Sequence, residues 1–197
     1  MLLKAFKELN EFYIQQSVGF SNTYTYYSNQ KKVLAMAKVN KNVSKTIMNR
    51  IFQMIGLHSF SSHHYYLCDD KETLVYKLER ETGFSKKFQL KALDGNVLFT
   101  YDDKMNMSHP QVIIEDSVGG KIASLKGDMF GDRVDIIDID DKVQMTITKK
   151  GFPSSMKELF TTGGGYTVSI NRHVSDEWKI AFIAFATIYD LLFFSKK

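Results

Sequence analysis

The last part of the chain is an apolar segment without a polar face. Residues 178–194 read WKIAFIAFATIYDLLFF, and they follow a long series of short stretches of alternating hydrophobicity. A helix that is apolar all round is buried either in a large protein core or in a lipid bilayer. At about 1.5 Å per residue the segment spans roughly 25 Å, short of the roughly 30 Å hydrocarbon layer, and it carries Asp190 near its end. The choice between core and bilayer decides the fold.

The chain before this segment is a series of predicted β-hairpins. Alternating apolar runs are separated by turns rich in Asp, Gly or Asn, which tolerate the tight backbone of a hairpin. The turns fall at Asp69-Asp70-Lys71, Asp94-Gly95-Asn96, Val118-Gly119-Gly120 and Asp140-Asp141. The apolar phase shifts between Ile136 and Ile137, which predicts a β-bulge there. Twelve strands are expected, near residues 12–17, 22–28, 31–39, 63–68, 73–80, 85–92, 96–102, 110–115, 120–126, 132–138, 142–149 and 165–171.

Twelve antiparallel strands and one apolar helix fit together if the sheet closes into a barrel around the helix. Closure removes the sheet edges, and a barrel this wide needs an interior filler. We therefore expect a mainly β (α+β) fold, a closed twelve-stranded antiparallel barrel around a central helix at 175–194, capped by Ser175 or Asp176. Asp190 must then find backbone N–H donors or a cation. The residues expected to mark the core helix are Trp178, Phe182, Phe185, Ile188 and Asp190.

Composition supports a single intracellular domain over residues 1–197. The chain has 15 Phe and 10 Tyr but only 2 Pro, a composition that favours strands. Its one cysteine, Cys68, cannot form an intramolecular disulfide, which fits a reducing compartment. The N-terminus lacks the uninterrupted apolar stretch of a secretory signal. We expect a cytoplasmic location.

Residues 44–56 interrupt the strands with apolar residues at helical spacing and basic residues between them. This inserted amphipathic helix has two interpretations. It lies in a membrane interface with its basic residues near anionic head groups, or it covers one mouth of the barrel with its apolar face. The net charge is +4, and the first third of the chain is its basic part. The candidate lipid- or partner-binding residues are Lys38, Lys41, Lys45 and Arg50.

Catalytic, metal and cofactor motifs are weak in this sequence. His58, His63 and His64 lie close together but lack partner ligands at metal-site spacing. Ser154 and Lys157 share a serine-lysine spacing that also occurs elsewhere in the chain. We expect no enzymatic activity, no metal and no cofactor, and a serine hydrolase ranks last among the alternatives. Nucleic-acid binding is not expected, because the net charge is modest.

The hairpins resemble those of the tubby C-terminal-like superfamily, and within it the LURF-one-related and phospholipid-scramblase-like families. The residues that carry the resemblance read QLKALDGNVLFTYDD, QVIIEDSVGGKIASLKG and DIIDIDDKVQMTITKKG, followed by YTVSINRHVSDEWKIAFIAFATIYDLL. The resemblance covers almost the whole chain. It implies a twelve-stranded barrel around a hydrophobic helix and no enzymatic activity. No basic motif aligns residue by residue with the family's lipid-binding positions.

The function expected from these features is a non-enzymatic binding or scaffold module. Its partner is an anionic phospholipid or a protein, and its place is peripheral, at the inner face of a membrane. The alternative is a membrane-anchored, scramblase-like protein whose C-terminal segment lies in the bilayer, flanked by Ser195, Lys196 and Lys197. The sequence sets no oligomeric state.

Overall fold

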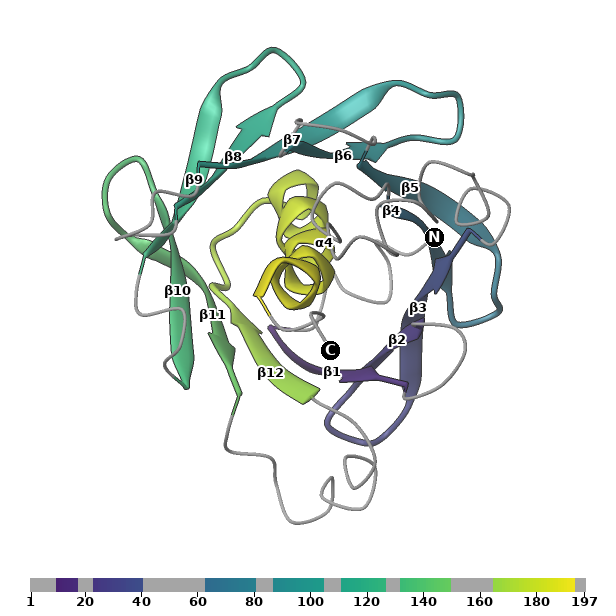
Figure 1. The fold of residues 1–197 in the computed structure, drawn as a ribbon. Coiled ribbons are helices and arrows are strands. Elements are labelled where there is room, and N and C mark those ends of the chain that lie inside the picture. Colours follow the sequence, from purple (N-terminus) through teal and green to yellow (C-terminus); the bar gives the residue numbers. More distant parts are fainter. Residues whose placement is uncertain are drawn as a thin grey trace, which may run out of the picture.

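The protein folds into a closed β-barrel with one helix, α4 (Asp176–Phe193), inside it (Figure 1). The structure is a computed structural model and describes residues 10–17, 23–40, 63–80, 87–104, 111–126, 132–149 and 165–193. The strands are β1 (Glu11–Gln16), β2 (Thr23–Tyr27), β3 (Val33–Val39), β4 (His63–Asp69), β5 (Leu74–Arg80), β6 (Lys87–Lys91), β7 (Val97–Asp103), β8 (Val112–Asp116), β9 (Lys121–Lys126), β10 (Arg133–Asp138), β11 (Val143–Thr148) and β12 (Gly165–Ile170).

The sheet is a simple antiparallel meander in which each strand pairs with its neighbours in sequence. The last strand returns to the first, and Phe12 of β1 lies opposite Val168 of β12, so the sheet has no free edge. The predicted twelve-stranded closed barrel with a C-terminal helix is confirmed. The register of β10 on β11 shifts between Ile136 and Ile137, which confirms the predicted bulge.

Five tight hairpins lie at one end of the barrel, which we call the hairpin rim. In each, the carbonyl of the first turn residue accepts the N–H of the fourth, as from Gly95 to Ala92 at 3.1 Å. The fourth residue always has positive φ, 96° at Gly95 and 84° at Gly119, so the predicted Asp94-Gly95 turn is confirmed. The turns span residues 28–32, 69–73, 92–96, 116–120 and 138–142.

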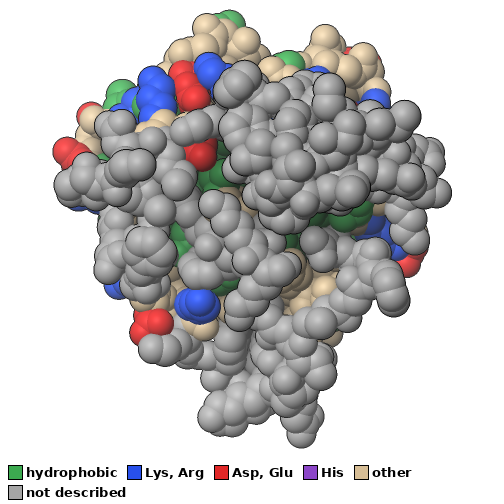
Figure 2. All heavy atoms as spheres, viewed as in Figure 1, with side chains coloured by type: hydrophobic (Ala, Val, Ile, Leu, Met, Phe, Trp, Pro, Cys, Tyr) green, Lys and Arg blue, Asp and Glu red, His purple; other side chains and the backbone are tan. Residues whose placement is uncertain are grey.

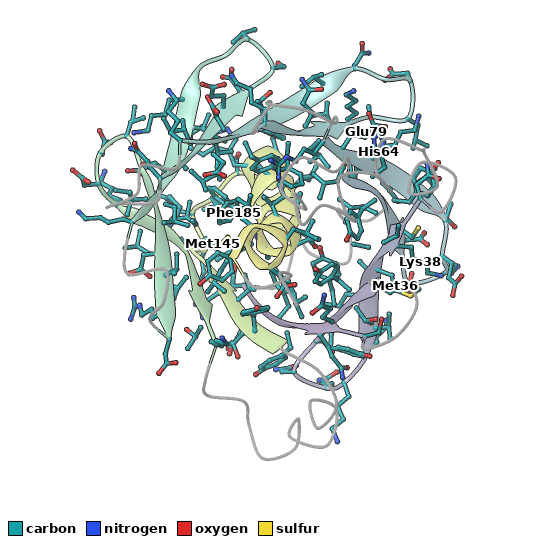
Figure 3. All side chains as sticks on the ribbon, viewed as in Figure 1. Met36, Lys38, His64, Glu79, Met145 and Phe185 are labelled. Carbon is teal, nitrogen blue, oxygen red and sulfur yellow. The ribbon has the colours of Figure 1, made fainter. Side chains whose placement is uncertain are left out.

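The barrel interior is filled by α4. Alternate strand residues point inward, as Tyr24 and Tyr26 do on β2, and are buried with the helix. Of the predicted core-helix residues, Phe182, Phe185 and Ile188 are fully buried, while Trp178 is partly buried against the same core. Met145 of β11 and Phe185 of α4, both labelled in Figure 3, belong to the same buried core. The interior is therefore a packed core.

Ser175 is the N-cap of α4, as its Oγ accepts the N–H of Trp178 at 3.2 Å. At the other end of the helix, the side chain of Asp190 is 2 % exposed. The hydroxyl of Tyr24 donates to its Oδ2 at 2.7 Å, and the hydroxyl of Tyr166 donates to Oδ1. Backbone N–H donors were predicted and are not what the structure shows. Of the predicted cation, the charge of Lys149 acts on Asp190 and lowers its pKa, but less than the two hydrogen bonds do. Phenol hydroxyls supply the hydrogen bonds, because tyrosines on β2 and β12 face the helix here.

The position of α4 shows that the apolar segment lies in the protein core. Its side chains from Ile180 to Leu191 are buried by the barrel wall, so they are not available to lipid. No helix within the described ranges is long and apolar enough to cross a bilayer. The predicted helix at 44–56 lies outside the described residues, as do Ser154, Lys157 and the N-terminal nine residues.

Candidate functional site

The outer wall of β3 to β6 carries a row of basic side chains. Register places Lys38 of β3 opposite Tyr66 of β4, Tyr66 opposite Lys77 of β5, and Lys77 opposite Lys91 of β6. Their sequence neighbours Ala37, Leu67, Leu78 and Leu90 are buried inside, so these four side chains face outward. Adjacent strands lie about 4.8 Å apart, so this basic row covers about 14 Å of the wall.

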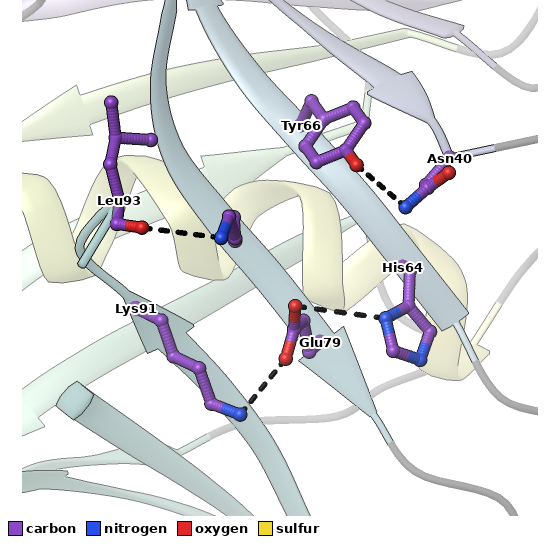
Figure 4. Close-up of polar contacts among 7 residues, drawn as sticks. Asn40, His64, Tyr66, Glu79, Lys91 and Leu93 are labelled. Carbon is purple, nitrogen blue, oxygen red and sulfur yellow. Dashed lines mark hydrogen bonds and ion pairs between the residues drawn. The ribbon is translucent and has the colours of Figure 1, made fainter. Parts of the chain in front are cut away.

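The basic row contains an unfavourable charge pair. Lys77 and Lys91 lie directly opposite each other, and like charges in that position destabilise a sheet. Glu79, in the adjacent row, offsets part of this repulsion, because the Nζ of Lys91 lies 2.9 Å from its Oε2. His64 approaches the same carboxylate, with Nδ1 3.7 Å from Oε1 (Figure 4). Burial raises the pKa of Glu79. The hydrogen bond and charge of Lys91, followed by the charges of His64 and Lys77, lower the pKa by more than burial raises it, so the net shift is downward.

The other members of the row are also positioned by hydrogen bonds and an ion pair. Lys38 pairs with Glu72 at 2.5 Å, and the Nζ of Lys77 donates to the carbonyl of Leu93 at 3.3 Å. The hydroxyl of Tyr66 accepts a hydrogen bond from Asn40 at 2.7 Å, which leaves its own hydrogen available to another acceptor. Three lysines thus share two carboxylates, and a phenol donor lies between them. This arrangement can hold an anion against the wall.

Only part of this row matches the residues that the sequence singled out. Lys38 was predicted and belongs to the row, whereas Lys41, Lys45 and Arg50 lie outside the described residues. Sequence reasoning missed Tyr66, Lys77, Lys91 and the bridging Glu79. Each occupies an outward position in its own strand, but only the register between strands shows that they form one row.

Charges elsewhere on the described surface are mixed. Seen along the barrel, Lys/Arg and Asp/Glu side chains lie side by side at the perimeter (Figure 2). An open depression of about 460 Å³ lies where β1 meets β12, and its lining includes Glu11, Arg172, Asn29 and Asn171. One charge of each sign there selects no class of ligand. Among the residues that the structure describes, no group of three or more His, Cys, Asp or Glu side chains could hold a metal ion.

Comparison with known proteins supports the fold. No protein-family model matches the chain, and no curated protein matches it by sequence. Among solved structures, the crystal structure of a protein from Arabidopsis thaliana, AT5G01750, is similar with a TM-score of 0.55 and 12% sequence identity. The match covers 96% of this chain and 98% of the plant protein. The chain is therefore similar in fold to that protein over almost its whole length.

Proposed function

We propose that this protein is a non-enzymatic, tubby-like binding module that attaches peripherally to anionic membrane lipids through the basic row on β3 to β6. The observation that carries the proposal is the lysine pair Lys77 and Lys91, placed opposite each other with Tyr66 beside them. An anion over the row would relieve their repulsion. The resemblance to the LURF-one-related and scramblase-like families favours the same class of function, at the cytoplasmic face of a membrane.

The filled interior also supports an external site. Small molecules bind in clefts and cavities, but the inside of this barrel is occupied by buried side chains such as Phe182 and Phe185. The alternative of a C-terminal bilayer anchor does not fit, because α4 is enclosed by the strands. A ligand therefore has the wall and the rims available to it.

Vesicle flotation tests the proposal. Wild-type protein is expected to float with vesicles of phosphatidylcholine and phosphatidylserine, and to remain in solution with phosphatidylcholine alone. Each lysine near an anionic surface contributes about 1 kcal/mol, so Lys77→Gln should lower the partition coefficient about fivefold. Lys121→Gln is the matched control, since it removes an exposed lysine of β9 outside the row and should have little effect.

A second experiment separates the wall from the basic segment at 44–56, which lies outside the described residues. Changing Lys45 and Arg50 to Glu tests whether the predicted 44–56 helix contributes to the same attachment. If Lys77→Gln keeps the thermal melting curve and floats as wild type does, the basic row is not the lipid site. If wild-type protein never floats with anionic vesicles, the lipid proposal fails as a whole.

A further inference from the structure

Three consecutive hairpins of the rim expose aliphatic side chains at their tips. Leu93 lies in the β6–β7 turn, Val118 in the β8–β9 turn and Ile139 in the β10–β11 turn, and they are 48 %, 89 % and 70 % exposed. Val143, directly after the third turn, is 42 % exposed. These three hairpins follow one another around the barrel (Figure 1), and we call them the aliphatic arc.

The aliphatic tips have no role in the turns themselves. The bends are set by backbone hydrogen bonds and by aspartate oxygens. Asp116 Oδ1 accepts the N–H groups of Val118 and Gly120 at 3.0 and 2.8 Å, and in the β6–β7 turn Asp94 Oδ1 accepts the N–H of Asn96 at 3.0 Å. Turn tips ordinarily carry polar residues. The two remaining tight hairpins follow this rule, since their turns read SNQKK at 28–32 and DDKET at 69–73. The same turn geometry thus forms with polar tips, and only one arc of the rim is aliphatic.

The charge of the aliphatic arc is opposite to that of the chain. Its three turns contain five carboxylates and one lysine, whereas the whole protein has a net charge of +4. Lys142 lies 3.6 Å from Asp140, and Lys126 of β9 lies 3.5 Å from Asp141, so two of the acids are paired. The Nζ of Lys77 also lies at the arc, 3.3 Å from the carbonyl of Leu93. Five carboxylates against these three lysines leave an excess of negative charge. An anionic lipid surface would be repelled by this arc, and a cationic surface would be attracted to it.

From the exposed aliphatic tips and their acidic surroundings, we propose that the aliphatic arc docks a partner protein through a segment that combines aliphatic residues with Lys or Arg. Leu93, Val118 and Ile139 would supply the apolar contacts. The carboxylates beside them would select a basic segment over an acidic one. This surface lies on the rim and meets the basic row where the Nζ of Lys77 donates to the carbonyl of Leu93. Its contacts are made by the aliphatic tips and the turn carboxylates, so it does not depend on the proposed lipid function.

Peptide selection on the full chain tests the proposal. A phage-displayed library of random dodecapeptides is selected on wild-type protein and counter-selected on the double variant Val118→Ser/Ile139→Ser. The expected result is enrichment of peptides that contain both aliphatic and basic residues. A synthetic copy of an enriched peptide should bind the double variant at least tenfold more weakly, and rising ionic strength should weaken its binding to wild type. Lys71→Ser, in a polar hairpin, should bind it as wild type does.

The outcomes separate a protein partner from a membrane. Both altered side chains are exposed, so the double variant should melt as wild type does. Enrichment of acidic or uncharged peptides, or equal binding to the variant, overturns the proposal. If no peptide is enriched, the proposal is overturned. If wild type also floats with phosphatidylcholine vesicles and the double variant does not, the arc inserts into lipid instead. If Lys77→Gln loses flotation with anionic vesicles but still binds the peptide, that result supports the lipid site on the wall and leaves the proposal for the arc intact.

Discussion

At the scale of single residues, the buried carboxylate of Asp190 is the least expected group in the core. Burial raises its pKa above the ordinary value of 3.8, and the hydrogen bonds from Tyr166 and Tyr24 oppose that rise. The two tyrosines respond in the same environment, since burial and then the charge of Asp190 raise their pKa values far above the ordinary 10.0. The carboxyl is therefore harder to ionise in the folded protein than in the unfolded chain.

The free energy of unfolding should depend on pH through this group. A carboxyl whose pKa is raised by folding contributes stability that is fully present below the unfolded value, 3.8, and is lost as pH rises through the folded value. Asp190→Asn cannot titrate, so its stability should fall less than that of wild type as pH rises from about 4 towards neutrality. Urea denaturation at several pH values measures the difference. Parallel curves for the two proteins would show that Asp190 does not titrate in this range.

A second change removes one hydrogen bond and keeps the carboxyl group. Tyr166→Phe should destabilise the fold by about 1 to 3 kcal/mol near neutral pH, because it leaves a buried carboxylate with one donor fewer. Tyr27→Phe is a suitable control, since Tyr27 is only partly buried and lies on β2 next to the inward-facing Tyr26. Urea denaturation of both variants checks this, and equal midpoints would contradict the role given to Tyr166.

The sequence could predict that Asp190 needs partners but not which ones. Its isolation in an apolar helix is a local feature, visible in residues 178–194. Tyr24 precedes it by 166 positions and Tyr166 by 24, so their approach depends on closure of the barrel. The same reason kept Lys77 and Lys91 from being recognised as a pair, because they meet only through the register of β5 on β6.

At the scale of elements, the five tight turns show how local sequence defines the meander. Each turn needs one residue with positive φ, which is inexpensive for glycine and costs other residues roughly 1–2 kcal/mol. Gly95 and Gly119 meet the need, whereas Lys31, Glu72 and Asp141 adopt φ of 62° to 64° with a side chain. Turn chemistry and alternation are both local, which is why the strands and the bulge at Ile136 were predictable.

Two single substitutions in these turns should change the free energy of unfolding in opposite directions. A Cβ at Gly95 would meet no atom within 4 Å, so Gly95→Ala tests backbone strain alone and should destabilise by about 1 kcal/mol. Lys31→Gly relieves the same strain in the β2–β3 turn, and the greater freedom of glycine in the unfolded chain offsets part of the gain. Thermal denaturation compares the two. A stabilised Gly95→Ala would contradict the αL requirement at that position.

At the scale of the whole molecule, the barrel and α4 depend on each other. The wall encloses a helix whose Phe182, Phe185 and Ile188 are fully buried, and Tyr101 joins the two by donating its hydroxyl hydrogen to the carbonyl of Ala181 at 2.8 Å. The sequence predicted this dependence, because the apolar helix had to be buried and a barrel of twelve strands needed a packed interior. Function could not be predicted at this scale. Within the described residues the interior is filled, so the candidate surfaces are the outer wall and the turn tips, and their side chains are brought together by strand register and turn sequence.

Loss of packing inside the barrel should therefore affect the entire fold. Phe185 stacks on Tyr101, with ring centroids 6.2 Å apart, and Phe185→Ala should cost about 3–5 kcal/mol, a large part of the roughly 5–15 kcal/mol that stabilises a domain. Val143→Ala is the control and should stay within about 0.5 kcal/mol, since Val143 is exposed. Urea denaturation followed by tryptophan fluorescence measures both. A chain ending at Ser175 should show no cooperative transition by circular dichroism, because twelve strands without the helix would enclose an empty core. A cooperative transition in that chain would mean that the wall is stable without its filler.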